Sequence, residues 1–124
     1  MRNIPRFESV LKTSISIAVL LVVSYALMWN MRKSEGIWIT FDDVQVARSV
    51  VMAEELKAGQ FPVRMLHNFG NGGGYMLFNF YSPLVYYATG LAVLAGLNPT
   101  NAVKIAFESS YIIAGLGMFF LLRS

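Results

Sequence analysis

Apolar residues in this 124-residue chain gather into three long blocks that polar intervals separate. Residues 13–31 and 77–97 contain no charged side chain, and residues 101–122 contain only Lys104 and Glu108. A helix needs about 20 predominantly apolar residues to cross a bilayer, so each block predicts one membrane-spanning helix. The expected fold is therefore all-α: polytopic membrane helices with three spans, which form a single membrane unit over residues 1–124.

The first block has a second interpretation, as a secretory signal peptide. Its basic start, formed by Arg2, Arg6 and Lys12, and the small-x-small residues 24–26 would suit cleavage. The apolar run continues past that point to Trp29, a residue type that anchors helices at membrane interfaces. We therefore expect an uncleaved span. Basic residues lie on both sides of it, so their distribution leaves its orientation undecided.

The polar interval 32–76 is predicted to be a loop that contains one amphipathic helix. The spacings Thr40-x-x-Asp43 and Asp42-x-x-Gln45 both fit a capping box, so the helix is expected to begin at Asp42 or Asp43. Gly59 is expected to end it. Its apolar positions follow a spacing of three or four residues, namely Val46, Val50, Ala53 and Leu56 with Ala47 and Val51. We expect this stripe to lie on the membrane surface, with Arg48, Glu54, Glu55 and Lys57 on the opposite face.

A glycine-rich segment closes the interval. Residues 68–74 include four glycines and two asparagines, which permit backbone conformations that other side chains forbid. The segment is not a dinucleotide fingerprint, because Tyr75 stands where the last glycine is required. Two interpretations stay open: close approach of the backbone to a lipid phosphate, and a plain connecting loop, which is the commoner role of glycine runs.

The second and third spans carry recognisable ends. Pro83 is expected in the first turn of the second span, where its missing N–H costs nothing. Nearby tyrosines are expected to form an aromatic belt at the membrane interface: Tyr81, Tyr86 and Tyr87. Residues 96–100 predict a tight turn, with Thr100 or Asn101 as the cap of the third span.

Composition narrows the classes of function. The chain is 56% hydrophobic and has a formal net charge of +3, but its basic residues are scattered and form no patch with exposed aromatic residues. Nucleic-acid binding is therefore not expected. The absence of cysteine excludes disulfide and thiolate chemistry.

Five segments that follow one another in order carry a family resemblance. They read GQFPVR at 59–64, GNGGGY at 70–75, FNFYSPLVYY at 78–87, GLNPTNAVKI at 96–105 and AGLGMFFLLR at 114–123. Together they resemble the N-terminal part of polytopic membrane proteins labelled 6-pyruvoyl-tetrahydropterin-synthase-related, a family that is similar to GT-C glycosyltransferases. The resemblance covers about residues 38–123.

The resemblance implies an integral protein of the plasma membrane whose first loop is extracytoplasmic. It implies acidic catalytic or metal-binding residues in that loop, a polyprenyl-phosphate-linked sugar donor, and further C-terminal helices of the same protein as partners of this part. Family members often carry a histidine before the aspartate and another a few residues later. Asp42 and either Val46 or Ala47 stand at those positions here, which argues against a histidine-based metal site.

The candidate catalytic residues are Asp42 and Asp43, which also supply hard oxygen ligands suited to Mg²⁺ or Mn²⁺. Capping of the helix alone is an equally weighted interpretation, and the two roles are compatible if Asp42 caps and Asp43 meets substrate. The candidate substrate-binding residues are Arg64, His67 and Tyr75. His67 is the only histidine, and a lone histidine is more often a hydrogen-bonded surface residue than a catalytic one.

The resulting functional prediction is a membrane glycosyltransferase-like protein of which this part alone is inactive. A non-enzymatic integral membrane scaffold or subunit is the alternative.

Overall fold

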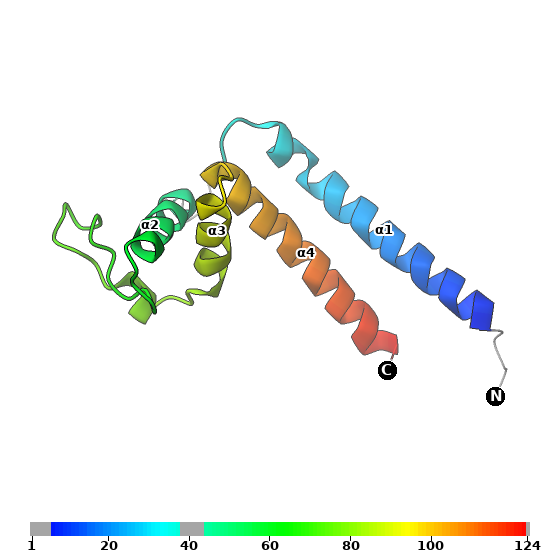
Figure 1. Ribbon diagram of the computed structural model, residues 1–124. Helices are drawn as coiled ribbons and strands as arrows, with labels where there is room; N and C mark the ends of the chain where they lie inside the picture. The colour runs from blue at the N-terminus through cyan, green and yellow to red at the C-terminus, as the bar shows by residue number, and fades with distance from the viewer. Residues whose placement is uncertain (1–5, 38–43, 124) are drawn as a thin grey trace. The chain divides into compact units, whose positions relative to one another are not determined.

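The structure is a computed structural model that describes residues 6–37 and 44–123. In these ranges the regular elements are helical, and no strand longer than an isolated bridge occurs. Figure 1 labels the four α-helices, which are α1 (Arg6–Lys33), α2 (Gln45–Lys57), α3 (Leu84–Leu94) and α4 (Pro99–Arg123). A short 3₁₀ helix, η1, covers Leu77–Asn79. The prediction of an all-α fold is confirmed for the described residues.

The chain divides into two compact units. One comprises Met1–Ser34 together with Phe107–Ser124, and the other comprises Glu35–Ala106. We call them the apolar unit and the inserted unit. The apolar unit contains α1 and most of α4, whereas the inserted unit contains α2, η1, α3 and the start of α4.

Two helices are long and apolar enough to cross a membrane, Val10–Lys33 and Pro99–Arg123. They contain the first and third predicted spans, residues 13–31 and 101–122. The second of these helices has 25 residues, which gives a length of about 37 Å at the helical rise and exceeds a hydrocarbon core of about 30 Å. Large apolar side chains along both helices are exposed, for example Val22 and Leu122.

Specific contacts organise the apolar unit. Arg32, near the end of α1, forms an ion pair with Glu108 of α4. A Cβ on Gly115 would lie 2.6 Å from the Leu20 Cδ1 atom, so the missing side chain at this position of α4 permits a close approach of Leu20.

The second predicted span, residues 77–97, is wrong. The structure breaks this block into η1, a bend and α3, and α3 has only 11 residues, about 16 Å of helix. Pro83 precedes α3 and has no N–H to continue a helix from η1, and it disfavours helical backbone at Ser82. Part of the block belongs to a protein core: Leu77, Phe78 and Tyr86 are buried within the inserted unit, whereas other large apolar side chains of the block, such as Leu84 and Leu91, are exposed.

That core forms where α2 packs against α3, which lie side by side in Figure 1. Met52 is fully buried, and a Cβ on Gly90 of α3 would lie only 2.8 Å from its Cγ atom. The hydroxyl groups of Ser49 and Thr89 share a hydrogen bond of 2.8 Å across the same contact. The buried residues of this core are Val51, Met52, Val63, Leu66, Leu77, Phe78 and Tyr86.

The helix predicted in the polar interval exists as α2. It begins at Gln45, after Val44 at its N-cap, and not at Asp42 or Asp43 as predicted, and it ends as predicted before Gly59, whose φ is +86°.

The buried face of α2 matches the predicted stripe in part, since Val51 and Ala53 are buried. Arg48 and Glu55 are buried although they were assigned to the solvent face, whereas Val46 and Val50 are only partly buried. The contacts of α2 with α3 and with the loop that follows α2 determine which of its side chains are buried. The distribution of apolar residues along α2 does not determine this by itself. A contact of α2 with a membrane surface stays a prediction.

The turn between α3 and α4 is confirmed, with Gly96 at a φ of +95°. The cap of α4 is Asn98, not Thr100 or Asn101 as predicted. The Asn98 side-chain oxygen accepts a hydrogen bond of 3.0 Å from the Thr100 backbone N–H. Pro99 therefore occupies the first helical position, where it suits a helix start.

Candidate functional site

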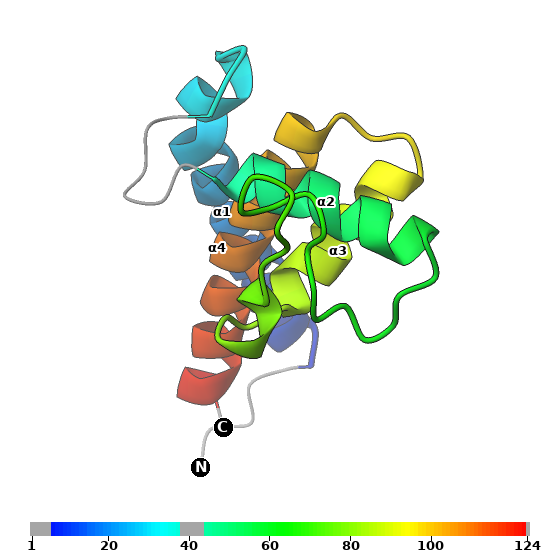
Figure 2. The same cartoon turned by 90° about the vertical axis from the view of Figure 1, so that its left-hand side faces the viewer.

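The candidate site lies on the loop that joins α2 to η1, which Figure 2 shows folded back alongside α2. Leu66 and Tyr75 exchange two backbone hydrogen bonds of 2.9 and 3.0 Å and so close the glycine-rich segment into a narrow hairpin. Its turn needs left-handed backbone at several positions, with φ of +65° at Gly70, +83° at Gly72 and +79° at Gly74. Glycine adopts this conformation without a steric penalty, which explains the composition of the segment.

The amides of this turn act within the hairpin. The N–H of Gly73 donates to the carbonyl of Gly70 at 3.0 Å, and the N–H of Gly74 donates to the carbonyl of Phe69 at 3.0 Å. These two groups are therefore not available to cradle a phosphate. Of the two interpretations of the glycine run, the geometry favours the connecting turn.

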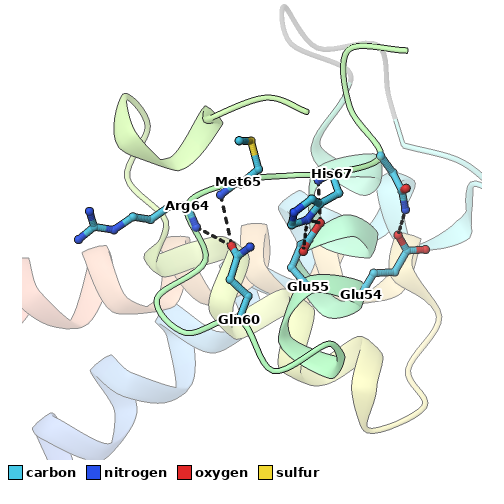
Figure 3. A network of polar contacts seen from close by, with 7 residues as sticks. Glu54, Glu55, Gln60, Arg64, Met65 and His67 are labelled. Carbon is cyan, nitrogen blue, oxygen red and sulfur yellow. Dashed lines mark hydrogen bonds and ion pairs between the residues drawn. The ribbon is translucent and has the colours of Figure 1, made fainter. Parts of the chain in front are cut away.

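Two polar side chains fasten the loop. The phenolic oxygen of Tyr87 on α3 accepts a hydrogen bond of 2.7 Å from the backbone N–H of the buried Val63. The Gln60 side-chain oxygen accepts hydrogen bonds from the backbone N–H groups of Arg64, at 2.8 Å, and Met65, at 3.2 Å (Figure 3). The loop is thus held at its first residues as well as by the hairpin.

The centre of the site is a contact between Glu55 on α2 and His67 on the loop, which faces it in Figure 3. The His67 Nδ1 atom lies 2.8 Å from one carboxylate oxygen of Glu55 and 3.0 Å from the other. The backbone N–H of His67 donates to the same carboxylate at 2.7 Å. The Glu55 side chain is only 6% exposed, whereas the His67 side chain is 66% exposed. A buried carboxylate therefore holds an imidazole that solvent reaches.

The adjacent residues Glu54 and Asn68 form a similar contact between α2 and the loop. The Asn68 side-chain amide donates a hydrogen bond of 2.9 Å to Glu54, and both residues are exposed. Consecutive carboxylates of α2 thus receive consecutive residues of the loop. The side chains of α2 therefore hold this part of the loop in place.

A second polar cluster joins α2 to α3. The Arg48 guanidinium donates to the Tyr86 hydroxyl at 3.2 Å and lies 4.9 Å from the centre of the Tyr81 ring. The Tyr86 hydroxyl in turn donates to Gln45. Of the predicted aromatic belt of Tyr81, Tyr86 and Tyr87, Tyr86 is buried inside the inserted unit and does not fit an interfacial position. For Tyr81 and Tyr87 the belt stays a prediction.

The predicted site residues take different places. His67 and Tyr75 belong to the same hairpin, with Tyr75 pairing through its backbone and its side chain half exposed. Arg64 is exposed, and its guanidinium points away from His67 in Figure 3. Asp42 and Asp43, with the predicted Mg²⁺ or Mn²⁺ site, lie outside the described residues. Within residues 6–37 and 44–123, no group of three or more metal-ligating side chains is found.

Glu55 belongs to the candidate site although no sequence motif marks it. The helical period placed it on the solvent face of α2, and 12 residues of sequence separate it from its partner. No motif marks that spacing, because the contact depends on how the loop returns along α2.

Comparisons of the chain with protein-family models, with curated proteins and with solved structures found no match.

Proposed function

We propose that this chain is the N-terminal part of a GT-C-like membrane glycosyltransferase, which transfers a sugar from a polyprenyl-phosphate donor to an extracytoplasmic acceptor. The observation that carries the proposal is the position of the inserted unit in the chain. It begins two residues after α1 ends at Lys33, and its last residues belong to α4. Both neighbouring helices are long and apolar enough to cross a membrane.

This connectivity favours a substrate that is itself anchored in lipid. A polar loop that is joined to spanning helices at both ends stays within reach of the headgroup region, where a polyprenyl phosphate presents its sugar. An exposed cation such as Arg64 suits the phosphate of such a donor. The ordered resemblance of residues 38–123 to GT-C-like proteins supports the same reaction class.

The proposed role of Asp43 in the external loop remains that of the sequence prediction. Asp43 acts on substrate as a base or as a ligand for Mg²⁺ or Mn²⁺. The capping role predicted for Asp42 is not kept, because Val44 stands at the N-cap of α2 and, among the described residues, no side chain caps that helix. Further C-terminal helices of the same protein complete the site, so residues 1–124 alone do not catalyse transfer.

The test is transfer of labelled sugar from polyprenyl phosphate by the purified full-length protein in lipid vesicles. Asp43→Asn keeps the side-chain size and should lower turnover by about 10²- to 10⁴-fold if Asp43 is a general base. Asp42→Asn is the matched neighbour and should have a milder effect, because Asp42 is not proposed to meet substrate. Near-normal turnover by the Asp43 variant would contradict its assignment. A folded wild-type protein that transfers no sugar would favour the alternative, a membrane scaffold or subunit.

A further inference from the structure

We infer that His67 is a catalytic proton acceptor and that Glu55 is the residue that positions it. The inference rests on the proposed function and names the group that activates the acceptor hydroxyl. With His67 in this role, Asp43 is left as a metal ligand.

The tautomer of His67 follows from its partner. An ionised carboxylate has only acceptor sites, so the His67 Nδ1 atom, which lies 2.8 Å from Glu55, must carry the proton of that hydrogen bond. In the neutral imidazole the other ring nitrogen, Nε2, then has a free lone pair. This is the arrangement in which a carboxylate orients a histidine base in hydrolytic triads.

The position of His67 is fixed through its main chain as well as its ring. Its backbone N–H donates to Glu55 at 2.7 Å, and it directly follows Leu66, which is fully buried and paired with Tyr75. Few rotations remain for the ring once both contacts are made. A base that is held in advance loses little entropy when substrate binds.

Access to solvent distinguishes this pair from a purely structural contact. The His67 side chain is 66% exposed, although the carboxylate that holds it is 6% exposed. If Glu55 only held the loop against α2, its hydrogen bond with the backbone N–H of His67 would be enough. Here the same carboxylate also contacts the imidazole ring (Figure 3), and the His67 side chain nevertheless stays largely exposed.

In the proposed step, the acceptor hydroxyl oxygen forms a bond to the anomeric carbon of the donor sugar while its proton passes to His67 Nε2. The bond between that carbon and the phosphate oxygen breaks, and the polyprenyl phosphate leaves with the electron pair. The resulting imidazolium is stabilised by the Glu55 carboxylate, and the exposed ring afterwards releases its proton to water.

The first measurement is the tautomer. His67 is the only histidine in these 124 residues, and in full-length protein labelled with ¹⁵N-histidine its signals are those that disappear in the His67→Asn variant. We expect Nδ1 to be protonated and Nε2 unprotonated in the neutral ring. The opposite tautomer, with Nε2 protonated, overturns the inference whatever the protein transfers.

The second measurement is sugar transfer by variants that separate structure from chemistry. His67→Asn places an amide N–H near the position of Nδ1, so it keeps a donor for Glu55 but has no counterpart of Nε2. We expect turnover to fall by about 10²- to 10⁴-fold with the protein still folded. Normal turnover by this variant overturns the inference and leaves the proposed function standing.

Glu55→Gln tests the positioning role. Glutamine still accepts both hydrogen bonds from His67, so a merely structural role predicts unchanged turnover. Loss of the charge should lower turnover by about 10- to 100-fold, which is the effect of a hydrogen bond to a charged group. Glu54→Gln is the matched control: it makes the same change in the adjacent carboxylate, which contacts Asn68, and should leave turnover unchanged. Equal effects of the two substitutions overturn the role of Glu55, whereas a wild-type protein without any sugar transfer refutes the proposed function and the catalytic step with it.

Discussion

Replacing Gly90 with alanine would place a methyl group inside the contact between α2 and α3. The new Cβ would lie 2.8 Å from the Met52 Cγ atom, 3.2 Å from the Met52 Cβ atom and 3.3 Å from the Ala53 backbone nitrogen. None of these atoms is the free end of a flexible side chain, so the helices must move apart to relieve the clash. Overpacking of this kind costs about 1–3 kcal/mol.

An opposing effect reduces the net change. Alanine is favoured over glycine within a helix by about 1 kcal/mol. The contact should therefore weaken by about 0–2 kcal/mol, and because about 1.4 kcal/mol corresponds to a factor of ten, amide exchange in α2 should become up to about 30-fold faster. Hydrogen–deuterium exchange of peptides from Gln45–Lys57 in the full-length protein measures this change.

A double-mutant cycle gives the sharper test. Met52→Ala removes the Cγ atom that makes the closest contact, so Gly90→Ala should be less harmful in that background by about 0.5–3 kcal/mol. Gly117→Ala is the control, because a Cβ there would meet nothing within 4 Å, and it should leave exchange in α2 unchanged. The reasoning is refuted if Gly90→Ala slows exchange in the wild-type background, or if its effect is the same with and without Met52.

Three further predictions concern the loop, the cap and the topology. Tyr87→Phe should leave the buried N–H of Val63 without its acceptor, at a cost of about 1–3 kcal/mol, and faster exchange should be confined to the start of the loop. Asn98→Ala should weaken the start of α4 by about 0.5–2 kcal/mol, whereas Asn98→Asp should be nearly neutral; equal exchange of both variants in the first turn of α4 would contradict the capping role. Because α3 is too short to span, single cysteines at Gly59 and Asn98 should react with a membrane-impermeant thiol reagent from the same side, and labelling from opposite sides would support the second predicted span, residues 77–97.

The candidate site was only partly accessible to prediction. The sequence marked His67 as the only histidine and the glycine run as a place of unusual backbone, and both belong to the described loop. It assigned Glu55 to solvent, since helical spacing reports only which residues share a face. The pairing of Glu55 with His67 needed the return of the loop along α2, which depends on the buried residues Val63 and Leu66 and on the acceptor that Tyr87 provides.

Local composition by itself determined the two long helices, α1 and α4, and the C-terminal end of α2. Residues 13–31 and 101–122 are apolar over more than a bilayer's thickness, so helix is the structure that satisfies their backbone groups. The helix end at Gly59 and the turn at Gly96 could also be predicted from local sequence, because only glycine adopts their backbone conformation without strain. The structure of residues 77–97, in contrast, could not be determined from composition. Apolar composition does not fix the length of a helix. Only the structure shows that Pro83 separates η1 from the short helix α3 and that Gly90 of α3 packs against Met52.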